Sequence, residues 1–317
     1  MTASRRTVLT AGAAALGTAL LNGCSSARYA GPDRTLTIAS GQRGGLYVEF
    51  ANLLAAQVTA LEPDLRCAVK ETNGSIHNVL SVRDREADLG VVQADVARAA
   101  INGEAPFTGP VAIRGIGRVY EDYLQLVVRA DSPLTKLSEL AGRSVSLGTS
   151  GSGTAMISQR MMAAAGVEVF GRFESLDSAV TSLAKREIDA LVWCGGVPTP
   201  ALVKVHEQVG IRVLPLDHLL PKLRSGHVNT YQPVRLPAGT YKQSETPTIG
   251  VANLLVCAKT LPADVAAAVT RTLVLRANRL VPPTVVGTQF LDPHTLIGTL
   301  DVPLHAGAAA AYRDLHG

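Results

Sequence analysis

Aromatic residues are scarce in this chain of 317 residues, which contains seven Tyr, five Phe and a single Trp. A content of 4% aromatics argues against a surface that stacks rings on sugars or on nucleic-acid bases. A strong charge of one sign is also missing, because the formal net charge is only +4 and the Lys and Arg residues are scattered along the chain. We therefore expect no nucleic acid among the partners of this protein.

The spacings that would hold a metal ion or a nucleotide are absent as well. The histidines show no HxxxH or HExxH spacing and the cysteines form no CxxC pair, so no metal site is predicted. The glycine-rich turns lack the GxGxxG fingerprint and the Gly-Lys-Ser/Thr of a P-loop. Ser150 and Ser152 do not have the GxSxG spacing of a nucleophile elbow. The sequence therefore indicates neither a cofactor nor an enzyme.

The N-terminal segment has the composition of an export signal. Arg5-Arg6 supplies a positive region, and the apolar run over residues 11–21 is too short to cross a bilayer as a helix. Leu21-Asn22-Gly23-Cys24 follows and is typical of a lipoprotein cleavage box. We predict a signal peptide over residues 1–23 and a lipid on Cys24.

Residues 4–9, Ser-Arg-Arg-Thr-Val-Leu, also resemble a twin-arginine export signal. We therefore expect an extracytoplasmic protein that contacts the cell membrane through its N-terminal lipid, with the segment 24–34 as a tether. The alternative is an ordinary cleaved signal in which Cys24 occurs by chance.

Three further cysteines, Cys67, Cys194 and Cys257, lie in apolar, strand-like segments. Buried free thiols are the expected state of such residues. A disulfide between Cys67 and Cys257 stays open as an alternative, although three cysteines leave one unpaired in any case.

The most informative stretch is residues 146–154, Ser-Leu-Gly-Thr-Ser-Gly-Ser-Gly-Thr. An alternating strand pattern over 143–147 leads into it, and a helical pattern over 154–165, closed by Gly166, leads out of it. Glycines let the backbone approach a ligand, and the helix start adds unpaired N–H groups and partial positive charge. We predict that this corner holds a carboxylate. The alternative is a plain turn with good N-caps.

A second strand–glycine–helix corner occurs earlier, where a strand over 35–39 meets the glycine-rich turn 41–45. Two further polar turns, 73–75 and 93–95, follow the next predicted strands. The order β-α-β-α-β indicates a parallel sheet with helices on its faces. Since ligands of such sheets lie outside the carboxyl ends of the strands, the three turns are expected to meet at one rim.

The chain as a whole is predicted to form two α/β lobes. The first would comprise residues 35–129 plus 250–317 and the second residues 130–249, which repeat the β-α-β pattern. Two crossing strands would make a hinge, with the ligand in the cleft between the lobes.

Several local predictions can be compared with the structure. We expect separate strands over 113–119 and 124–128, and irregular or edge structure over 225–248. A last helix is expected from about 262 to 280, followed by a weakly patterned tail.

A set of short motifs in a fixed order carries a family resemblance. The motifs are Gly41-x-x-Gly44-Gly45-x-Tyr47, Asn73-Gly74-Ser75, residues 87–95, residues 123–130, residues 140–148, Gly151-Ser152-Gly153-Thr154, residues 188–198 and residues 237–241. Over residues 35 to 280 the chain resembles the TAXI-type solute receptors, extracytoplasmic binding proteins associated with tripartite (TRAP) transporters.

This resemblance implies a type II periplasmic-binding-protein fold and a receptor for small carboxylates such as glutamate, glutamine or 2-oxo acids. The receptor would pass its ligand to a membrane permease of the TRAP type. The sequence departs from the family pattern after the first glycine turn, at Val48, Glu49, Phe50 and Ala51, and it carries Arg43 within that turn.

The motifs and the corners together predict a set of ligand-binding residues. They are Gly41, Arg43, Gly44, Tyr47, Asn73, Gly74, Ser75, Gln93, Asp95, Ser150, Gly151, Ser152, Gly153, Thr154, Trp193, Gly195 and Pro198.

Six of these residues have an open alternative, and for Ser75, as for Asn73, it is a plain turn with a helix N-cap. Arg43 would pair with a second carboxylate or stay solvated, and Tyr47 would cover the ligand or pack in the core. Asn73 would contact the ligand or only form a turn, and Asp95 would bind a ligand amine or cap a helix. Trp193 would contact the ligand or pack. For the whole protein, the main alternative is a lipoprotein of the same fold that senses a ligand without serving a permease.

Overall fold

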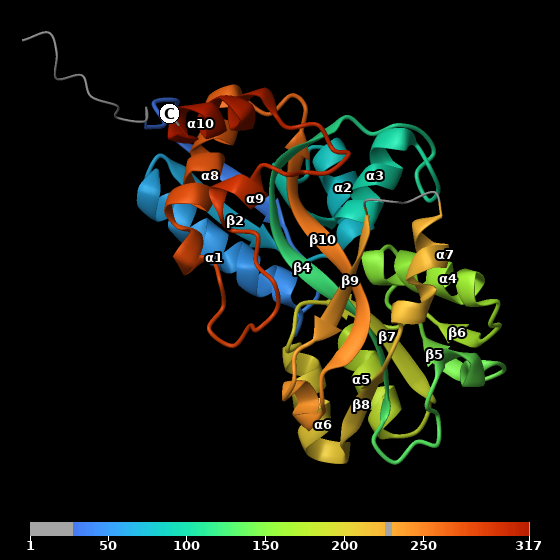
Figure 1. Ribbon diagram of the computed structural model, residues 1–317. Coiled ribbons are helices and arrows are strands. Elements are labelled where there is room, and N and C mark those ends of the chain that lie inside the picture. Colours follow the sequence, from blue (N-terminus) through green and yellow to red (C-terminus); the bar gives the residue numbers. More distant parts are fainter. Residues whose placement is uncertain (1–27, 226–229, 317) are drawn as a thin grey trace, which may run out of the picture.

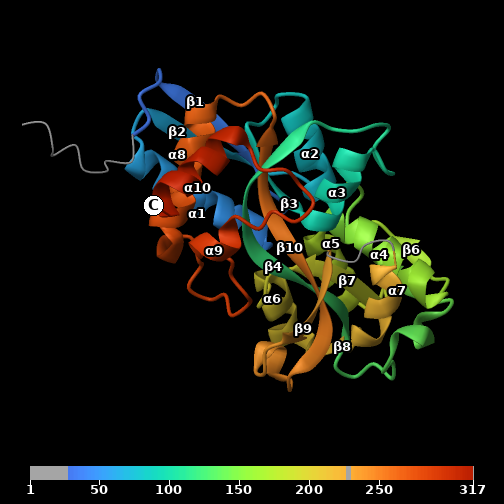
Figure 2. The same cartoon turned by 45° about the horizontal axis from the view of Figure 1, so that its top comes forward.

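The computed structural model describes residues 28–225 and 230–316, so the predicted signal peptide and Cys24 lie outside the described residues. Two long antiparallel strands, β4 (Ile113–Arg129) and β10 (Thr246–Ala258), run side by side from one lobe into the other, as Figure 1 and Figure 2 show. In the described part of the chain they belong to one ten-stranded sheet of order β2-β1-β3-β10-β4-β7-β5-β6, with β8 on β4 and β9 on β10. This is the predicted architecture of two α/β lobes joined by crossing strands.

The first lobe is built on three parallel strands beside β10. They are β1 (Arg34–Ala39), β2 (Leu65–Lys70) and β3 (Leu89–Gln93). Its helices are α1 (Leu46–Leu61), α2 (Ser75–Arg83), α3 (Ala94–Asn102), α8 (Ala263–Leu275), α9 (Pro293–Leu296) and α10 (Ala306–His316). One core packs α1, α8 and α10 on one face of the sheet, and a second core packs α2 and α3 on the other face.

The second lobe repeats this plan. Its strands are β5 (Ser144–Ser146), β6 (Phe170–Arg172), β7 (Ala190–Gly195), β8 (Ile211–Leu214) and β9 (Tyr231–Leu236). Its helices are α4 (Gly153–Ala165), α5 (Leu176–Ala184), α6 (Pro200–Val209) and α7 (Leu220–Arg224). Again two cores form, one beneath α4 and α7 and the other beneath α5 and α6.

The prediction of two strands over 113–119 and 124–128 was wrong, because β4 is a single strand of 17 residues. The polar residues Glu121 and Asp122 break the apolar pattern in the middle of this strand. Both are nevertheless buried, since β4 pairs there with β10 between the two lobes. These two side chains therefore lie at the hinge.

The tail after residue 283 is also more ordered than predicted. Its last helix, α10, packs on α8, and the Tyr312 hydroxyl donates to the carbonyl of Ile116 in β4 at 3.0 Å. Gly117 makes this approach possible, because a Cβ there would stand 2.8 Å from the Tyr312 oxygen. The run of alanines in α10 gave little hydrophobic periodicity, which is why the pattern did not indicate a helix.

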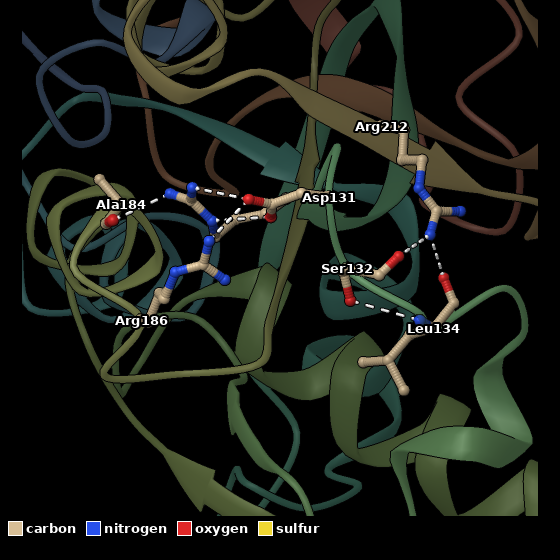
Figure 3. A network of polar contacts seen from close by, with 7 residues as sticks. Asp131, Ser132, Leu134, Ala184, Arg186 and Arg212 are labelled. Atoms are coloured by element: carbon tan, nitrogen blue, oxygen red, sulfur yellow. Dashed lines mark hydrogen bonds and ion pairs between the residues drawn. The ribbon is translucent and has the colours of Figure 1, made fainter.

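The far end of β4 is fixed in the second lobe by the polar contacts drawn in Figure 3. The Asp131 carboxylate accepts from Arg129 at 3.1 Å and from Arg186 at 2.6 Å, and Arg129 also donates to the carbonyl of Ala184. Nearby, Arg212 donates to the carbonyls of Ser132 and Leu134. The chain that leaves the hinge is thus tied to β8 and to the end of α5.

Cys67, Cys194 and Cys257 are free thiols, and the alternative of a disulfide between Cys67 and Cys257 is not realised. Among the described residues, no helix combines the length and the apolar character that spanning a membrane requires.

Candidate functional site

A small cavity lies between the two lobes, close to the hinge. It has a volume of about 30 Å³. Both lobes line it, with Gly41, Gln42, Gly45, Leu46, Tyr47, Asn73, Gly74, Ser75 and Gln93 from the first and Ser152, Gly153, Thr154, Trp193, Cys194, Gly195 and Gly196 from the second. None of these side chains carries a formal charge.

Four helices begin at this cavity. Their N-cap residues are Gly45 for α1, Gly74 for α2, Gln93 for α3 and Ser152 for α4, and all four line it. The first N–H groups of a helix have no partner within the helix, and the helix dipole places partial positive charge at that end. The cavity is therefore suited to an anion although no cationic side chain lines it.

The two lobes are closed on each other around the cavity. The His77 N–H donates to the carbonyl of Gly151 at 3.2 Å, and the Asn73 amide donates to the carbonyl of Ser150 at 3.3 Å. On the other side, Gln42 accepts from the N–H of Leu176 at 2.9 Å. These contacts join the glycine corners of the first lobe to those of the second, so the corners predicted from sequence do meet.

Two glycines of the second lobe make this close approach possible. A Cβ on Gly153 would stand 1.9 Å from Oε1 of Gln93, and a Cβ on Gly196 would stand 2.1 Å from Leu46. Contacts under 3 Å are sterically forbidden, so any larger residue would hold the lobes apart.

The hydroxyl groups of the corner predicted to hold a carboxylate are already engaged. Ser152 accepts from the N–H of Ala155 at 3.0 Å and donates to the carbonyl of Thr149, so it caps α4. Thr154 accepts from the N–H of Cys194 and donates to the carbonyl of the same residue, which ties α4 to β7. These hydroxyls shape the corner, and the backbone N–H groups of Gly153 and Thr154, at the start of α4, are left as its donors.

A polar network forms the wall on the side of the hinge. The Tyr47 hydroxyl donates to Asn253 in β10 and lies 3.1 Å from Ser75 Oγ, which in turn accepts from the N–H of Gln93. The Gln93 amide donates to Asp122 in β4 at 2.9 Å. The cavity wall is thus connected to both hinge strands.

Burial changes the acidity of the hinge carboxyls. It raises the pKa of Asp122 to about 7, although the amides of Gln93 and Asn253 favour the ionised form. It also raises the pKa of Glu121 to about 7, against the opposing effect of Arg118, whose guanidinium lies 3.2 Å away. Two adjacent hinge carboxyls therefore change charge near neutral pH.

Eleven of the predicted site residues line the cavity. They are Gly41, Tyr47, Asn73, Gly74, Ser75, Gln93, Ser152, Gly153, Thr154, Trp193 and Gly195. Trp193 also packs against Gly45 and donates its indole N–H to Thr199 at 3.1 Å, so packing and lining are combined in one side chain.

Six predicted residues, Arg43, Gly44, Asp95, Ser150, Gly151 and Pro198, lie outside the lining. Gly44 faces Ala201, Gly151 packs on His77, Ser150 contributes its carbonyl to lobe closure, and Pro198 follows the lining residue Gly196.

Two charged residues need correction. Arg43 is exposed and pairs with Glu71 at 3.0 Å, because its turn directs the side chain to solvent rather than into the cleft. Asp95 is fully buried, accepting from Tyr231 at 3.0 Å and from Arg160 at 3.4 Å in the second lobe. Burial raises its pKa, the guanidinium of Arg160 opposing the shift. Asp95 therefore links the lobes and does not reach the cavity.

Five lining residues were missed by the sequence reasoning. Gln42, Gly45, Leu46, Cys194 and Gly196 all lie beside predicted residues, within the same two turns. The signal that could have found Gly45 is its place directly before the apolar face of α1, which is an N-cap position. Across residues 28–225 and 230–316, no cluster of three or more potential metal ligands occurs.

Comparison with solved structures finds the same architecture at low sequence identity. A periplasmic transporter gives a TM-score of 0.56 at 14% identity, over 90% of this chain and 93% of that chain. MatC from Rhodopseudomonas palustris with bound malate gives 0.53 at 17% identity, over 77% of this chain and 85% of that chain. A histidine kinase sensor domain with similarity to periplasmic binding proteins gives 0.51 at 12% identity, over 78% of this chain and 92% of that chain. The predicted fold, that of two-lobe periplasmic binding proteins, is confirmed.

A sequence model of one protein family covers nearly the whole described chain. The match runs over residues 38–315, from within β1 to within α10. It includes both lobes and all four N-caps at the cavity. The chain therefore belongs to the NMT1-like family.

Proposed function

We propose that this protein is an extracytoplasmic receptor that captures a small carboxylate, such as glutamate, glutamine or a 2-oxo acid, by closing its two lobes. The observation that carries the proposal is the meeting of four helix N-termini at one uncharged cavity between the lobes. Each helix terminus stabilises a nearby anion by about 0.3–1 kcal/mol, and by up to about 2 kcal/mol when partly buried. Charge-assisted hydrogen bonds to the N–H groups add about 1.5–3 kcal/mol each.

The type of receptor and the transporter that it serves are proposed from the motifs in the sequence. We propose that the receptor is of the TAXI type and delivers its ligand to a membrane permease of the TRAP type, without chemistry of its own. Membership of the NMT1-like family agrees with a role in solute binding. We further propose residues 35–129 plus 250–317 as the first lobe and 130–249 as the second. Each lobe has its own pair of hydrophobic cores, and the end of β4, from Tyr123 to Val128, packs in those of the second lobe.

The same proposal includes export, by the twin-arginine signal of residues 4–9, and a lipid anchor on Cys24. Both depend on the N-terminal sequence alone. Mass spectrometry of the membrane-bound protein tests the anchor, because a diacylated Cys24 adds the mass of its acyl chains to the N-terminal peptide.

A ligand screen tests the receptor function. The purified protein is heated with amino acids, 2-oxo acids, hydroxy acids and dicarboxylates at millimolar concentration, and the melting temperature is measured. Binding to the folded state alone raises that temperature, by mass action. The methyl esters of the same acids are the matched control, because they keep the shape but lose the charge. No shift with any acid, or equal shifts with acids and esters, would contradict the proposal.

A sensory lipoprotein of the same fold is the second candidate. It is favoured by the similarity to a histidine kinase sensor domain, which shares the two-lobe architecture. A gene for a large multi-span permease beside this one would support transport. A gene for a sensor kinase in that place, together with co-purification of its product, would support sensing.

A further inference from the structure

One buried acceptor at the cavity has no partner in the protein. Gln93 is only 2% exposed, and its Oε1 atom makes no hydrogen bond. This atom lies against Gly153 at the start of α4, where both residues line the cavity. An unpaired buried polar atom costs about 1–3 kcal/mol, so a ligand that donates to it gains that energy.

Two hydrogen-bond acceptors fix the orientation of the Gln93 side-chain amide. Nε2 of Gln93 donates to Oδ2 of Asp122 at 2.9 Å and to the carbonyl of Cys194 at 3.4 Å. An ionised carboxylate and a carbonyl can only accept, so both hold the NH₂ group away from the cavity. Oε1 is consequently the atom that Gln93 offers to a ligand.

We propose that Asp122 is a positioning residue that holds Gln93 as an acceptor, and that the site therefore prefers 2-hydroxy carboxylates to 2-oxo carboxylates. The inference rests on the proposed function, and it replaces the amino acids and 2-oxo acids named there by 2-hydroxy acids as the preferred ligands of the same site. The carboxylate would meet the helix N-termini, and the neighbouring hydroxyl would donate to Oε1 of Gln93. A 2-oxo group has no proton to donate and would leave that acceptor unpaired.

Amino acids are expected to bind more weakly than hydroxy acids of the same size. An ammonium group can donate to Gln93, but it brings a positive charge into a cavity whose lining contains no carboxylate. Lactate, pyruvate and alanine share one carbon skeleton, so a comparison of these three acids isolates the group beside the carboxylate.

The positioning is expected to depend on pH. The ionisable groups that act on Asp122 are Glu121 beside it, Asp95, Tyr47, Tyr120 and the Cys194 thiol. None of these is a cation, and burial raises the pKa of Asp122 to about 7. Below that pH the protonated carboxyl would donate to Oε1 of Gln93. The acceptor would then no longer be offered to the ligand.

Isothermal titration with lactate, pyruvate and alanine tests the inference at pH 8 and at pH 5.5. At pH 8 the wild-type protein is expected to bind lactate about tenfold more tightly than pyruvate, as one hydrogen bond of about 1.4 kcal/mol gives. This ratio is expected to fall toward one in Asp122→Ala at pH 8, because alanine removes the oxygen that accepts from Nε2 of Gln93, and in the wild-type protein at pH 5.5. Glu121→Gln is the matched control, because it removes the neighbouring buried carboxyl, which makes no contact with Gln93, and it should keep the ratio at pH 8.

Equal affinity for lactate and pyruvate at pH 8, tighter binding of pyruvate or alanine, or an unchanged ratio in Asp122→Ala would overturn the inference. Should Asp122→Ala fail to fold, the pH profile of the wild-type protein decides. If only longer acids bind, 2-hydroxyglutarate and 2-oxoglutarate make the same comparison. Failure of every carboxylate to bind would instead refute the proposed function.

Discussion

Gly153 offers the sharpest test of lobe closure, because it begins helix α4 in one lobe and touches Gln93 of the other. The change to alanine adds a single carbon. That carbon would stand 1.9 Å from Oε1 and 2.7 Å from Cδ of Gln93, and 3.0 Å from Oγ of Ser75. Gln93 is buried and held by Asp122, so it cannot swing away freely. We therefore expect Gly153→Ala to prevent full closure of the lobes.

The expected loss of affinity follows from the hydrogen bonds that the ligand gains when the lobes close. A ligand held by an open receptor keeps the donors of one lobe and loses those of the other. Two charge-assisted hydrogen bonds at the low end of their range amount to about 3 kcal/mol, or roughly 100-fold in affinity. The helix itself should not suffer, since alanine is a better helix former than glycine by about 1 kcal/mol.

The assay is isothermal titration of a carboxylate that the wild-type protein binds, combined with thermal unfolding of the ligand-free protein. Gly166→Ala at the other end of α4 is the matched control. Gly166 has a φ of 66° and no atoms within 4 Å of an added Cβ, so alanine there costs backbone strain alone. This control should unfold about 1 kcal/mol more easily and bind as before.

Gly153→Ala is thus expected to weaken ligand binding without weakening the helix. Gly166→Ala is expected to lower the stability and leave ligand binding unchanged. If Gly153→Ala bound the ligand as tightly as the wild-type protein, the closed arrangement of Gln93 and α4 would not be the ligand-bound state. The role assigned to closure would then be refuted.

Three further predictions follow from the charged residues. Because burial raises the folded pKa of Glu121 and Asp122 to about 7, above the values of an unfolded chain, the folded state binds more protons between about pH 4 and pH 7. Stability should therefore fall as pH rises across that window, and Asp122→Asn should flatten the profile of melting temperature between pH 5 and pH 8. Arg43→Ala should leave ligand affinity unchanged in titrations, because the side chain is 79% exposed, pairs with Glu71 and does not line the cavity; a clear loss of affinity would show that Arg43 belongs to the site. Arg160→Ala should lower the free energy of unfolding in urea by about 2 kcal/mol, since it leaves Asp95 buried without its cation; an unchanged midpoint would show that this interlobe pair contributes nothing.

Local structure followed closely from the sequence. The helix predicted over residues 154–165 is α4, with Ser152 as its cap and Gly166 as its left-handed stop. Such elements are predictable because capping, glycine conformation and apolar periodicity act within a few residues. The apolar pattern is interrupted at Glu121 and Asp122, and there the prediction failed because a distant segment decides the burial of these residues. Their burial comes from β10, more than a hundred residues away in the chain.

The sequence by itself determined that glycine-rich corners would stand before helices and that the chain would form α/β layers. Hydrogen-bond requirements of helix ends and the periodicity of apolar residues dictate both, whatever lies far along the chain. Only the tertiary structure decided which atoms of those corners face the cavity. It turned Arg43 to solvent and set Gln93 between Asp122 and Gly153. These outcomes depend on how two lobes fit together, and that fit is a property of packing between distant segments rather than of any local pattern.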